Sequence, residues 1–259
     1  MNASIAKATI AGCTAHMDSG LSIAVYQPYF FPFLPYWQLL QAADVFVIGD
    51  NLRYRMRGFI NRNSILLGHA PHLLSISIGK ASPNRRIDQI DIIDDFSRFR
   101  RTLHHAYHNA PSYEPAMAVI DQALGFEDRN LARFLGNQIK VVSGYLGLKA
   151  RITSLSELGI ACEYANRNQR LYDCAGALGA TRIINPLGST SLYDAGDFAS
   201  QGIALGFLRS NASGYPQHSR QFVPNLSIID AMMNLSQDGL AARMRDYEIV
   251  DAGGTPIWK

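Results

Sequence analysis

A strand, a helix and a second strand follow one another between Ser22 and Ile48, and this order constrains the fold more than any other feature of the chain. The stretch 22–26 is short, apolar and β-branched, which predicts a first strand. Residues 34–43 carry apolar side chains at helical spacing and no glycine, which predicts a helix. Val45 to Ile48 is an unbroken apolar run, as expected for a strand buried in a parallel sheet. Together they predict a βαβ unit with a right-handed crossover.

The rest of the chain extends this pattern and predicts an α/β fold, three-layer and Rossmann-like, with a mostly parallel sheet and a helical insertion. Further strands are predicted within 150–158, 181–188 and 202–208, with a helix over 171–178 closed by Gly179. Helical periodicity from about 94 to 147 predicts the insertion. Residues 71–79 and 86–92 read as two strands of a hairpin that turns at Pro83 and Asn84.

The expected organisation is a single domain over residues 22–250, with a tail at 251–259. Residues 1–21 lack a basic start followed by a long apolar core, so we expect a disordered leader rather than a secretory signal. No apolar run reaches the roughly 20 residues of a membrane span. The expected location is therefore the cytoplasm, without membrane insertion.

Composition narrows the class of partner. The chain is 47% hydrophobic and 17% charged over 259 residues, which is typical of a globular protein. A net charge of +3 is too small to argue for nucleic acid or an anionic membrane. We therefore expect a small-molecule partner and no nucleic acid, and leave homo-oligomerisation open.

Cysteine and histidine spacing predicts no metal site. The 3 cysteines form no closely spaced pair, and an odd number argues against a disulfide framework. His104 and His108 stand four apart on a predicted helix, a spacing that can hold zinc. We interpret them as exposed helix residues.

Two prolines, Pro28 and Pro32, lie among aromatic side chains directly after the first predicted strand. Proline is rare inside strands because it removes a ladder donor, so this stretch predicts a loop. Ligands of open α/β sheets bind beyond the carboxyl ends of the strands. The loop is therefore either a binding wall or a packed corner, and we favour a wall that includes Tyr29 and Phe31. Asp50 ends the next strand at the same edge. Its carboxylate can equally be a turn or helix-cap residue or part of a ligand-binding site.

An arginine-rich segment follows, in which Arg53, Arg55 and Arg57 alternate and share one face of an extended chain. Guanidinium groups bind phosphate or carboxylate in a bidentate way. Asn61-Arg62-Asn63 adds polar groups that are costly to bury unpaired. The segment predicts an anion site, and the alternative is a solvated edge strand decorated with charge.

Three weaker signals lie in the second half of the chain. Gly188, with the hydroxyls after it, can present donors to an anion or form an ordinary turn. Arg170 stands near a helix start, against the preference of the helix dipole. Tyr215 and Gln217 precede a helix whose cap is predicted at Ser227 and are expected to face a site.

The sequence resembles the WbqC-like family of bacterial proteins. The resemblance rests on QPYFFPFLPYWQLLQAADVFVIGD, RGFINRNSI, NPLGSTSLYDAGDF, GYPQ and LSIIDAMMN, which occur in this order between about residues 22 and 240. The matching positions are Gln27, Pro28, Phe31, Pro32, Asp50, Arg57, Gly58, Asn61, Arg62, Asn63, Arg170, Gly188, Tyr193, Tyr215, Gln217 and Asp230. The usual histidine before Gln-Pro is Tyr26 here, and tyrosine is a poor base at neutral pH.

The resemblance implies a biosynthetic enzyme, of surface polysaccharide or specialised metabolites, that transfers an acyl or aminoacyl group such as glycyl to an amine. The acceptor would be a polar small molecule or amino sugar with a phosphate or carboxylate. We expect Asp50 and Tyr26 in catalytic roles. The substrate-binding residues expected are Gln27, Tyr29, Phe31, Arg57, Asn61, Arg62, Asn63, Arg170, Gly188, Tyr193, Tyr215 and Gln217.

Two alternatives stay open. One is an ATP-dependent amide ligase, which would use ATP and magnesium as cofactors. The other is a non-catalytic binding or scaffold protein of a biosynthetic complex, which the replacement of the family histidine by Tyr26 favours.

Overall fold

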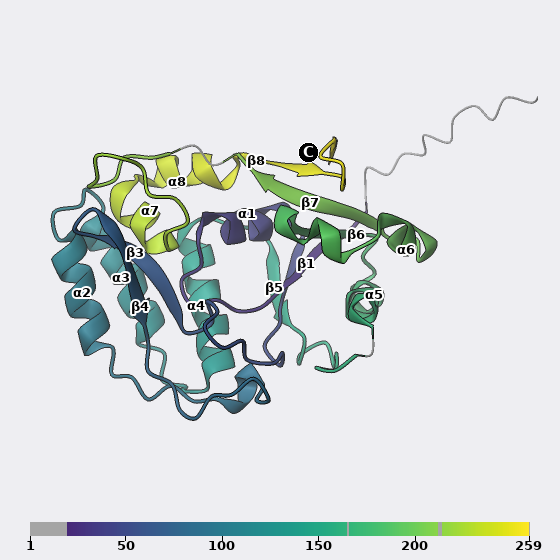
Figure 1. Ribbon diagram of the computed structural model, residues 1–259, viewed down its shortest axis with the longest axis horizontal. Coiled ribbons are helices and arrows are strands. Elements are labelled where there is room, and N and C mark those ends of the chain that lie inside the picture. Colours follow the sequence, from purple (N-terminus) through teal and green to yellow (C-terminus); the bar gives the residue numbers. More distant parts are fainter. Residues whose placement is uncertain (1–19, 165, 212–213, 259) are drawn as a thin grey trace, which may run out of the picture.

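A seven-stranded sheet organises the computed structural model, which describes residues 20–164, 166–211 and 214–258 (Figure 1). Its strand order is β5-β2-β1-β6-β7-β8-β9. The strands are β1 (Ser22–Tyr26), β2 (Val45–Ile48), β5 (Arg151–Ser154), β6 (Arg182–Pro186), β7 (Ala204–Ser210), β8 (Tyr247–Val250) and β9 (Pro256–Trp258). Neighbours from β5 to β7 run parallel, and β8 and β9 add an antiparallel edge. The predicted mostly parallel sheet is confirmed.

The first βαβ unit forms because its local signals agree. Every residue of β2 is buried, as its apolar run requires. Between β1 and β2 lies α1 (Leu34–Ala42), which starts with a proline in its first turn, where the missing N–H is no loss. The Asp44 carboxylate accepts hydrogen bonds from the Ser22 backbone N and Oγ, at 2.8 and 2.7 Å, and ties the starts of the two strands together.

Helices pack on both faces of the sheet. On one face, Ala24 and Phe46 join the larger core with α1, α4 (Leu131–Tyr145) and α8 (Gln237–Met244). On the other, Ile23 and Val47 pack with α5 (Arg167–Leu178) and α6 (Ala195–Ser200). Successive strand residues alternate between these two cores, as the pleat requires.

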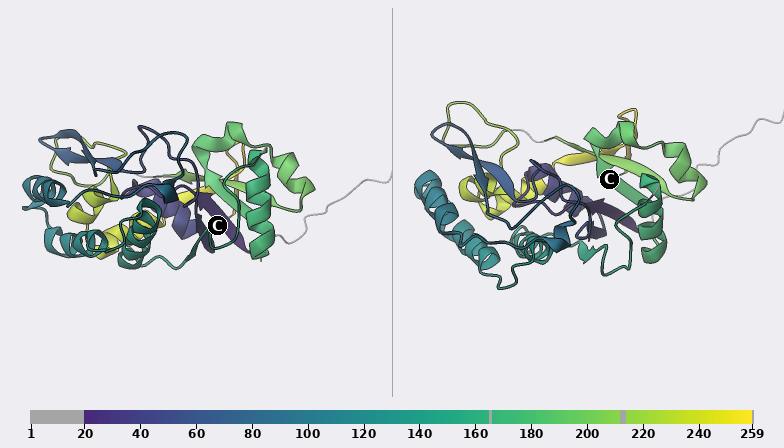
Figure 2. Two further views of the ribbon diagram at one scale, coloured as in Figure 1. Left: turned by 90° about the horizontal axis from the view of Figure 1, so that it is seen from below. Right: turned by 60° about the horizontal axis from the view of Figure 1, so that its bottom comes forward.

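The segment predicted to be helical contains α2 (Ser97–Tyr107), α3 (Tyr113–Leu124) and α4. With α7 (Ile228–Asn234), these helices gather at one end of the molecule, away from α5 and α6 (Figures 1 and 2). Asn130 caps α4 by accepting a hydrogen bond from the backbone N of Arg133.

The predicted hairpin of residues 71–79 and 86–92 is only partly correct. Strand β4 (Ala70–Ser75) pairs with the preceding β3 (Arg62–Leu67). The two predicted segments do meet at an isolated antiparallel bridge between Ile78 and Ile92, beside a hydrogen bond from Gly79 N to Asp91 O. The turn lies at Gly68 and His69, which both have positive φ, as a tight two-residue hairpin turn requires. Residues 86–92 also contain the short 3₁₀ helix η1 (Ile87–Gln89), so most of this segment is not a strand.

Two further expectations meet the structure at the chain ends. The leader expected at residues 1–21 lies almost wholly outside the described residues. Part of the expected tail forms β9, whose Trp258 ring lies 5.6 Å from the Arg182 guanidinium carbon. Within the described ranges, no helix has the length and apolar character needed to cross a bilayer.

Candidate functional site

The sheet opens between β1 and β6, where the direction of the strand order reverses. The chain builds outward from β1 to β2 and β5, then returns to place β6 on the other side of β1. Strands β1 and β2 stay paired from Ile23 to Tyr26, whereas β1 and β6 pair only at Ser22 and Ile23. The two strands therefore diverge toward their carboxyl ends. Such a reversal is where open α/β sheets bind ligands.

On the α1 side of this opening lies a pocket of 520 Å³, here termed the apolar chamber. The ends of three strands contribute Tyr26, Pro186 and Leu208 to its wall. Its other lining residues are Phe33, Pro35, Tyr36, Leu39, Arg55, Leu187, Gly188, Ser189, Leu192 and Ser210. The chamber is thus mostly apolar, with one cation and a few hydroxyls, which suits an apolar group that carries an anion.

On the opposite side lies a pocket of 430 Å³, here termed the polar chamber. It is lined by Gln27, Leu52, Arg53, Cys162, Glu163, Tyr164 and Arg170. Gln27 and Arg170, both predicted to bind substrate, therefore meet in one pocket. Tyr26 and Gln27 line different chambers because neighbouring residues at the end of a strand point to opposite faces.

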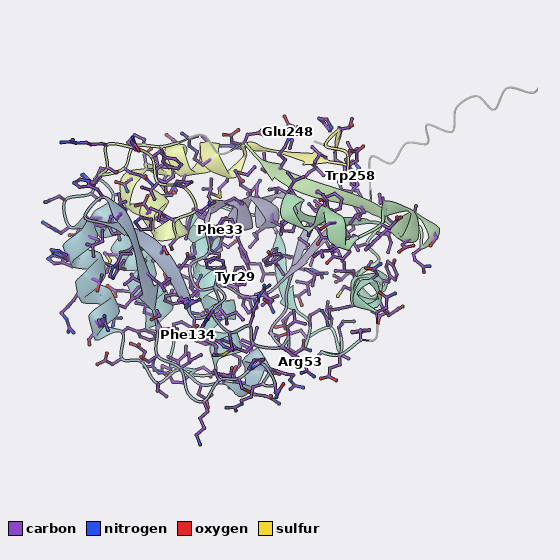
Figure 3. The ribbon with its side chains drawn as sticks, viewed as in Figure 1. Tyr29, Phe33, Arg53, Phe134, Glu248 and Trp258 are labelled. Atoms are coloured by element: carbon purple, nitrogen blue, oxygen red, sulfur yellow. The ribbon has the colours of Figure 1, made fainter. Side chains whose placement is uncertain are left out.

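The arginine-rich segment crosses between the two chambers. Its backbone is fixed by a 2.8 Å hydrogen bond from Tyr54 N to Arg85 O and by the Gln27 side chain, which donates to Arg53 O at 3.3 Å. Arg53 lines the polar chamber and Arg55 the apolar one. The predicted alternation thus supplies one guanidinium to each chamber. Figure 3 locates Arg53 at the lower rim of the molecule.

Tyr26 stands at the end of β1 among other aromatic rings. Its ring makes edge contacts with Tyr29 and Tyr36, with centroids 5.5 and 5.6 Å away. Burial raises the pKa of Tyr26 well above its usual value, and Tyr29 raises it further, while Arg55 opposes the shift. Tyr26 therefore stays protonated at neutral pH, when it can donate a hydrogen bond but cannot act as a base.

The aromatic-proline loop is largely a packed corner. Phe31 is 0% exposed and reaches neither chamber, so its predicted contact with substrate has no free ring surface. Polar side chains from three distant elements brace its backbone: Gln138 accepts from Phe31 N, while Asn63 and Ser227 donate to Phe31 O. Tyr29 and Phe33 of this loop are labelled in Figure 3, and Phe33 does reach the apolar chamber.

The predicted anion site at Asn61-Arg62-Asn63 is occupied by internal contacts. The Arg62 guanidinium donates to Gly58 O at 3.0 Å and to Arg57 O, which holds the loop where Arg57 has positive φ. Asn61 accepts from the Tyr54 hydroxyl and donates to the Ile76 carbonyl. Asn63 is only 3% exposed. Arg57 itself is exposed and lines neither chamber.

A second braced network surrounds the buried Asp230. Its carboxylate accepts hydrogen bonds from Tyr107 Oη, Tyr215 Oη and Gln217 Nε2, at 2.7, 2.8 and 2.7 Å. Tyr215 and Gln217, predicted to face substrate, thus point at Asp230 and fasten their loop to α7. Burial raises the pKa of Asp230 above its usual value, against the lowering effect of these three donors.

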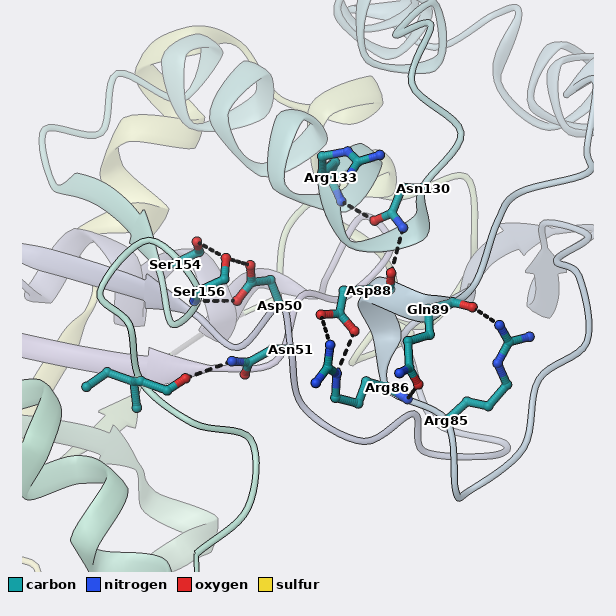
Figure 4. Close-up of polar contacts among 11 residues, drawn as sticks. Asp50, Asn51, Arg85, Arg86, Asp88, Gln89, Asn130, Arg133, Ser154 and Ser156 are labelled. Carbon is teal, nitrogen blue, oxygen red and sulfur yellow. Dashed lines mark hydrogen bonds and ion pairs between the residues drawn. The ribbon is translucent and has the colours of Figure 1, made fainter.

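Asp50 lies in a third pocket, of 420 Å³, against α4. Its carboxylate accepts from the backbone N of Ser156 at 3.1 Å and from the Ser156 hydroxyl (Figure 4). Lys140, Glu157 and Asn137 share this pocket. The structure therefore does not bring Asp50 and Tyr26, the two predicted catalytic residues, into one pocket.

Of the remaining predicted substrate-binding positions, one lines a chamber and the other packs against another side chain of the protein. Gly188 lines the apolar chamber, whereas the Tyr193 ring packs on Phe198 at 5.8 Å. Of the thiols, Cys162 lines the polar chamber, and burial raises the pKa of Cys174 to about 12. In the part of the chain that the structure describes, no group of three His, Cys, Asp or Glu side chains could hold a metal ion.

Sequence reasoning missed Leu208, Ser210 and Tyr164 as lining residues. Leu208 and Ser210 end β7, which the sequence did predict as a strand, but only the strand order places that end beside β6. No local signal marks Tyr164, whose ring lies 5.5 Å from the Arg170 guanidinium carbon.

Comparison with known proteins agrees with the motifs in the sequence. The chain is 22% identical over 223 residues to an uncharacterized protein of Mycobacterium tuberculosis, Rv1507c, which covers 83% of this chain and 94% of that protein. No solved structure matches the chain significantly. The model of the WbqC-like protein family matches residues 27–242, which include both chambers except for Tyr26. This chain belongs to the WbqC-like protein family.

Proposed function

We propose that the opening between β1 and β6 is the active site of a biosynthetic enzyme that transfers an acyl or aminoacyl group to an amine of a polar small molecule. One observation carries the proposal. An apolar and a polar chamber flank the end of β1, at the point where β1 and β6 diverge. Two chambers on either side of one strand end suit two substrates of different polarity. The proposal treats the sheet and its helices as the Rossmann-like arrangement expected from the sequence.

In this proposal the apolar chamber holds the acyl donor. Phe33, Leu39 and Leu208 surround its apolar part, and Arg55 binds an anionic group of the donor. The amine enters from the polar chamber, where Gln27 supplies an orienting hydrogen bond. Asp50 has no part in this scheme because its carboxylate lines a separate pocket.

The step itself requires an oxyanion donor more than a tuned base. The amine nitrogen attacks the acyl carbon of a thioester, the C–N bond forms and the C–S bond breaks. The proton lost by the nitrogen ends on the departing thiolate. Tyr26, held protonated by burial, would donate a hydrogen bond to the oxygen on which charge develops.

The test is a transfer assay by mass spectrometry with coenzyme A thioesters and aminoacyl donors against a panel of amines and amino sugars. Tyr26→Phe keeps the ring and removes the hydroxyl, so kcat should fall about 100- to 1,000-fold with KM nearly unchanged. Tyr145→Phe, on α4 and outside both chambers, is the control and should keep its activity.

Other outcomes would overturn the proposal. Amide formation only with ATP and magnesium would identify a ligase instead. Binding of panel members without product from any pair would identify a binding or scaffold protein. Full activity of Tyr26→Phe would remove Tyr26 from the mechanism.

A further inference from the structure

Arg170 of the polar chamber carries a polar group that the protein leaves unsatisfied. One terminal nitrogen of its guanidinium donates to Cys162 O at 2.6 Å. Its Nε–H is buried and has no hydrogen-bond partner among the described residues. Leaving a buried donor without an acceptor is costly, so such groups are usually satisfied by water or a ligand.

The wall around Arg170 is built rather than incidental. Asn51 donates to Ile160 O at 2.8 Å and so fixes the segment that leads to Cys162 (Figure 4). Tyr164, under the Arg170 guanidinium, is itself held by a 2.8 Å hydrogen bond to Asp173. Arg170 is therefore positioned by its neighbours and not by an ion pair, since no carboxylate in the described chain lies within salt-bridge distance of it.

Arg53 is the second cation of this chamber, and it is paired differently. Its guanidinium forms an ion pair with Glu163, in which the two side chains are 54% and 73% exposed. Ion pairs this exposed contribute little free energy, so a competing anion can displace Glu163. Glu163 thus occupies the place on Arg53 that an anionic ligand would take.

We propose that the polar chamber is an oxyanion-binding site in which Arg170 and Arg53 bind a phosphate or carboxylate group of the substrate, with Glu163 as the internal competitor. This deepens the proposed function, on which its role in a reaction rests, but the binding itself does not depend on turnover. It moves the anion site away from Arg57 and Arg62, where the sequence places it. The Arg62 guanidinium is engaged by loop carbonyls, whereas Arg170 has a free donor.

The test measures affinity by calorimetry at constant ionic strength, with inorganic phosphate and pyrophosphate as one arm and acetate and citrate as the other. Arg170→Gln should weaken binding about tenfold or more, as expected for loss of a charge-assisted hydrogen bond. Glu163→Gln should strengthen it a fewfold, because the competitor loses its charge. Arg98→Gln, an exposed cation on α2, removes the same charge elsewhere and should leave the affinity nearly unchanged.

The two arms decide between the ligand groups, since the arm that binds more tightly and responds to Arg170→Gln names the group. Equal weakening by Arg170→Gln and Arg98→Gln would show binding by net charge or an adventitious ion only, and would overturn the proposal. So would the absence of binding in both arms, or weaker binding by Glu163→Gln. Glu163 is exposed, so its variant tests the proposal even if Arg170→Gln fails to fold.

These results are separable from the fate of the proposed function. Anion binding that depends on Arg170 in a protein without transfer activity would sustain the site and refute the reaction. Transfer activity with an anion affinity that Arg170→Gln leaves unchanged would sustain the reaction and refute the anion site.

Discussion

At the scale of single residues, the polar side chains of the family motifs divide into those that brace the fold and those that line a chamber. Asn63, Ser227 and Asp230 are buried, hydrogen-bond within the protein and line neither chamber. Gln27 and Arg170 instead line the polar chamber. Residue type alone does not separate the two groups, because an amide or carboxylate that can bind a ligand can equally satisfy a buried backbone.

Asp230 makes a testable prediction for pH dependence. Because its pKa is raised in the folded protein, the folded state binds this proton more tightly than the unfolded state does. The stability it contributes is fully present below the unfolded pKa, about 4, and is lost as pH rises through the folded pKa. The difference in unfolding free energy between wild type and Asp230→Asn should therefore grow as pH falls toward about 4.

Urea unfolding of both proteins at a series of pH values measures this difference. A difference that shrinks as pH falls would mean that the three donors outweigh burial and that the pKa of Asp230 is lowered. Titration of the Asp230 carboxyl carbon by NMR would then also give a lowered pKa for Asp230.

At the scale of elements, replacing a glycine by alanine is expected to change the stability of the protein in opposite directions in α4 and in β7. A Cβ added at Gly136 would meet nothing closer than Ile48 Cδ1 at 3.9 Å, so Gly136→Ala should stabilise the protein by about 0.5 to 1 kcal/mol through helix propensity. A Cβ at Gly206 would lie 2.7 Å from both Ile249 and Trp258. Gly206→Ala should destabilise by roughly 1 to 3 kcal/mol, because β8 and β9 must shift.

Chemical denaturation of the two variants checks both signs. Stabilisation by Gly206→Ala would show that Trp258 does not pack against β7 in solution. Destabilisation by Gly136→Ala would show that the wall of α4 tolerates no added methyl group.

The elements that sequence reasoning predicted well are those with complete local signals. The β1, α1 and β2 bounds follow from apolar pattern and from proline in the first helical turn. The error at β4 has a local cause too, since Gly68-His69 is a weaker turn signal in the sequence than the proline turn downstream. Strand order could not be predicted from local signals, because it depends on pairings between distant segments. The residues that line the two chambers could not be predicted either, because strand order brings them together.

At the scale of the whole molecule, the candidate site exists because one strand pair separates. Residues from β1, β6, β7 and the loop before α5 meet only when β6 returns beside β1. The central claim is therefore that substrate occupies the two chambers beside β1.

The most direct test of that claim is to fill the apolar chamber and measure substrate transfer. Gly188 lies in its wall, and a Cβ added there meets no atom within 4 Å, so Gly188→Phe can place a ring there without a backbone clash. Gly176→Phe on α5 is the matched control, since it is equally open and outside both chambers. The account predicts that Gly188→Phe loses transfer activity at unchanged stability while Gly176→Phe retains it. Full activity of Gly188→Phe would contradict the account and place the reaction elsewhere.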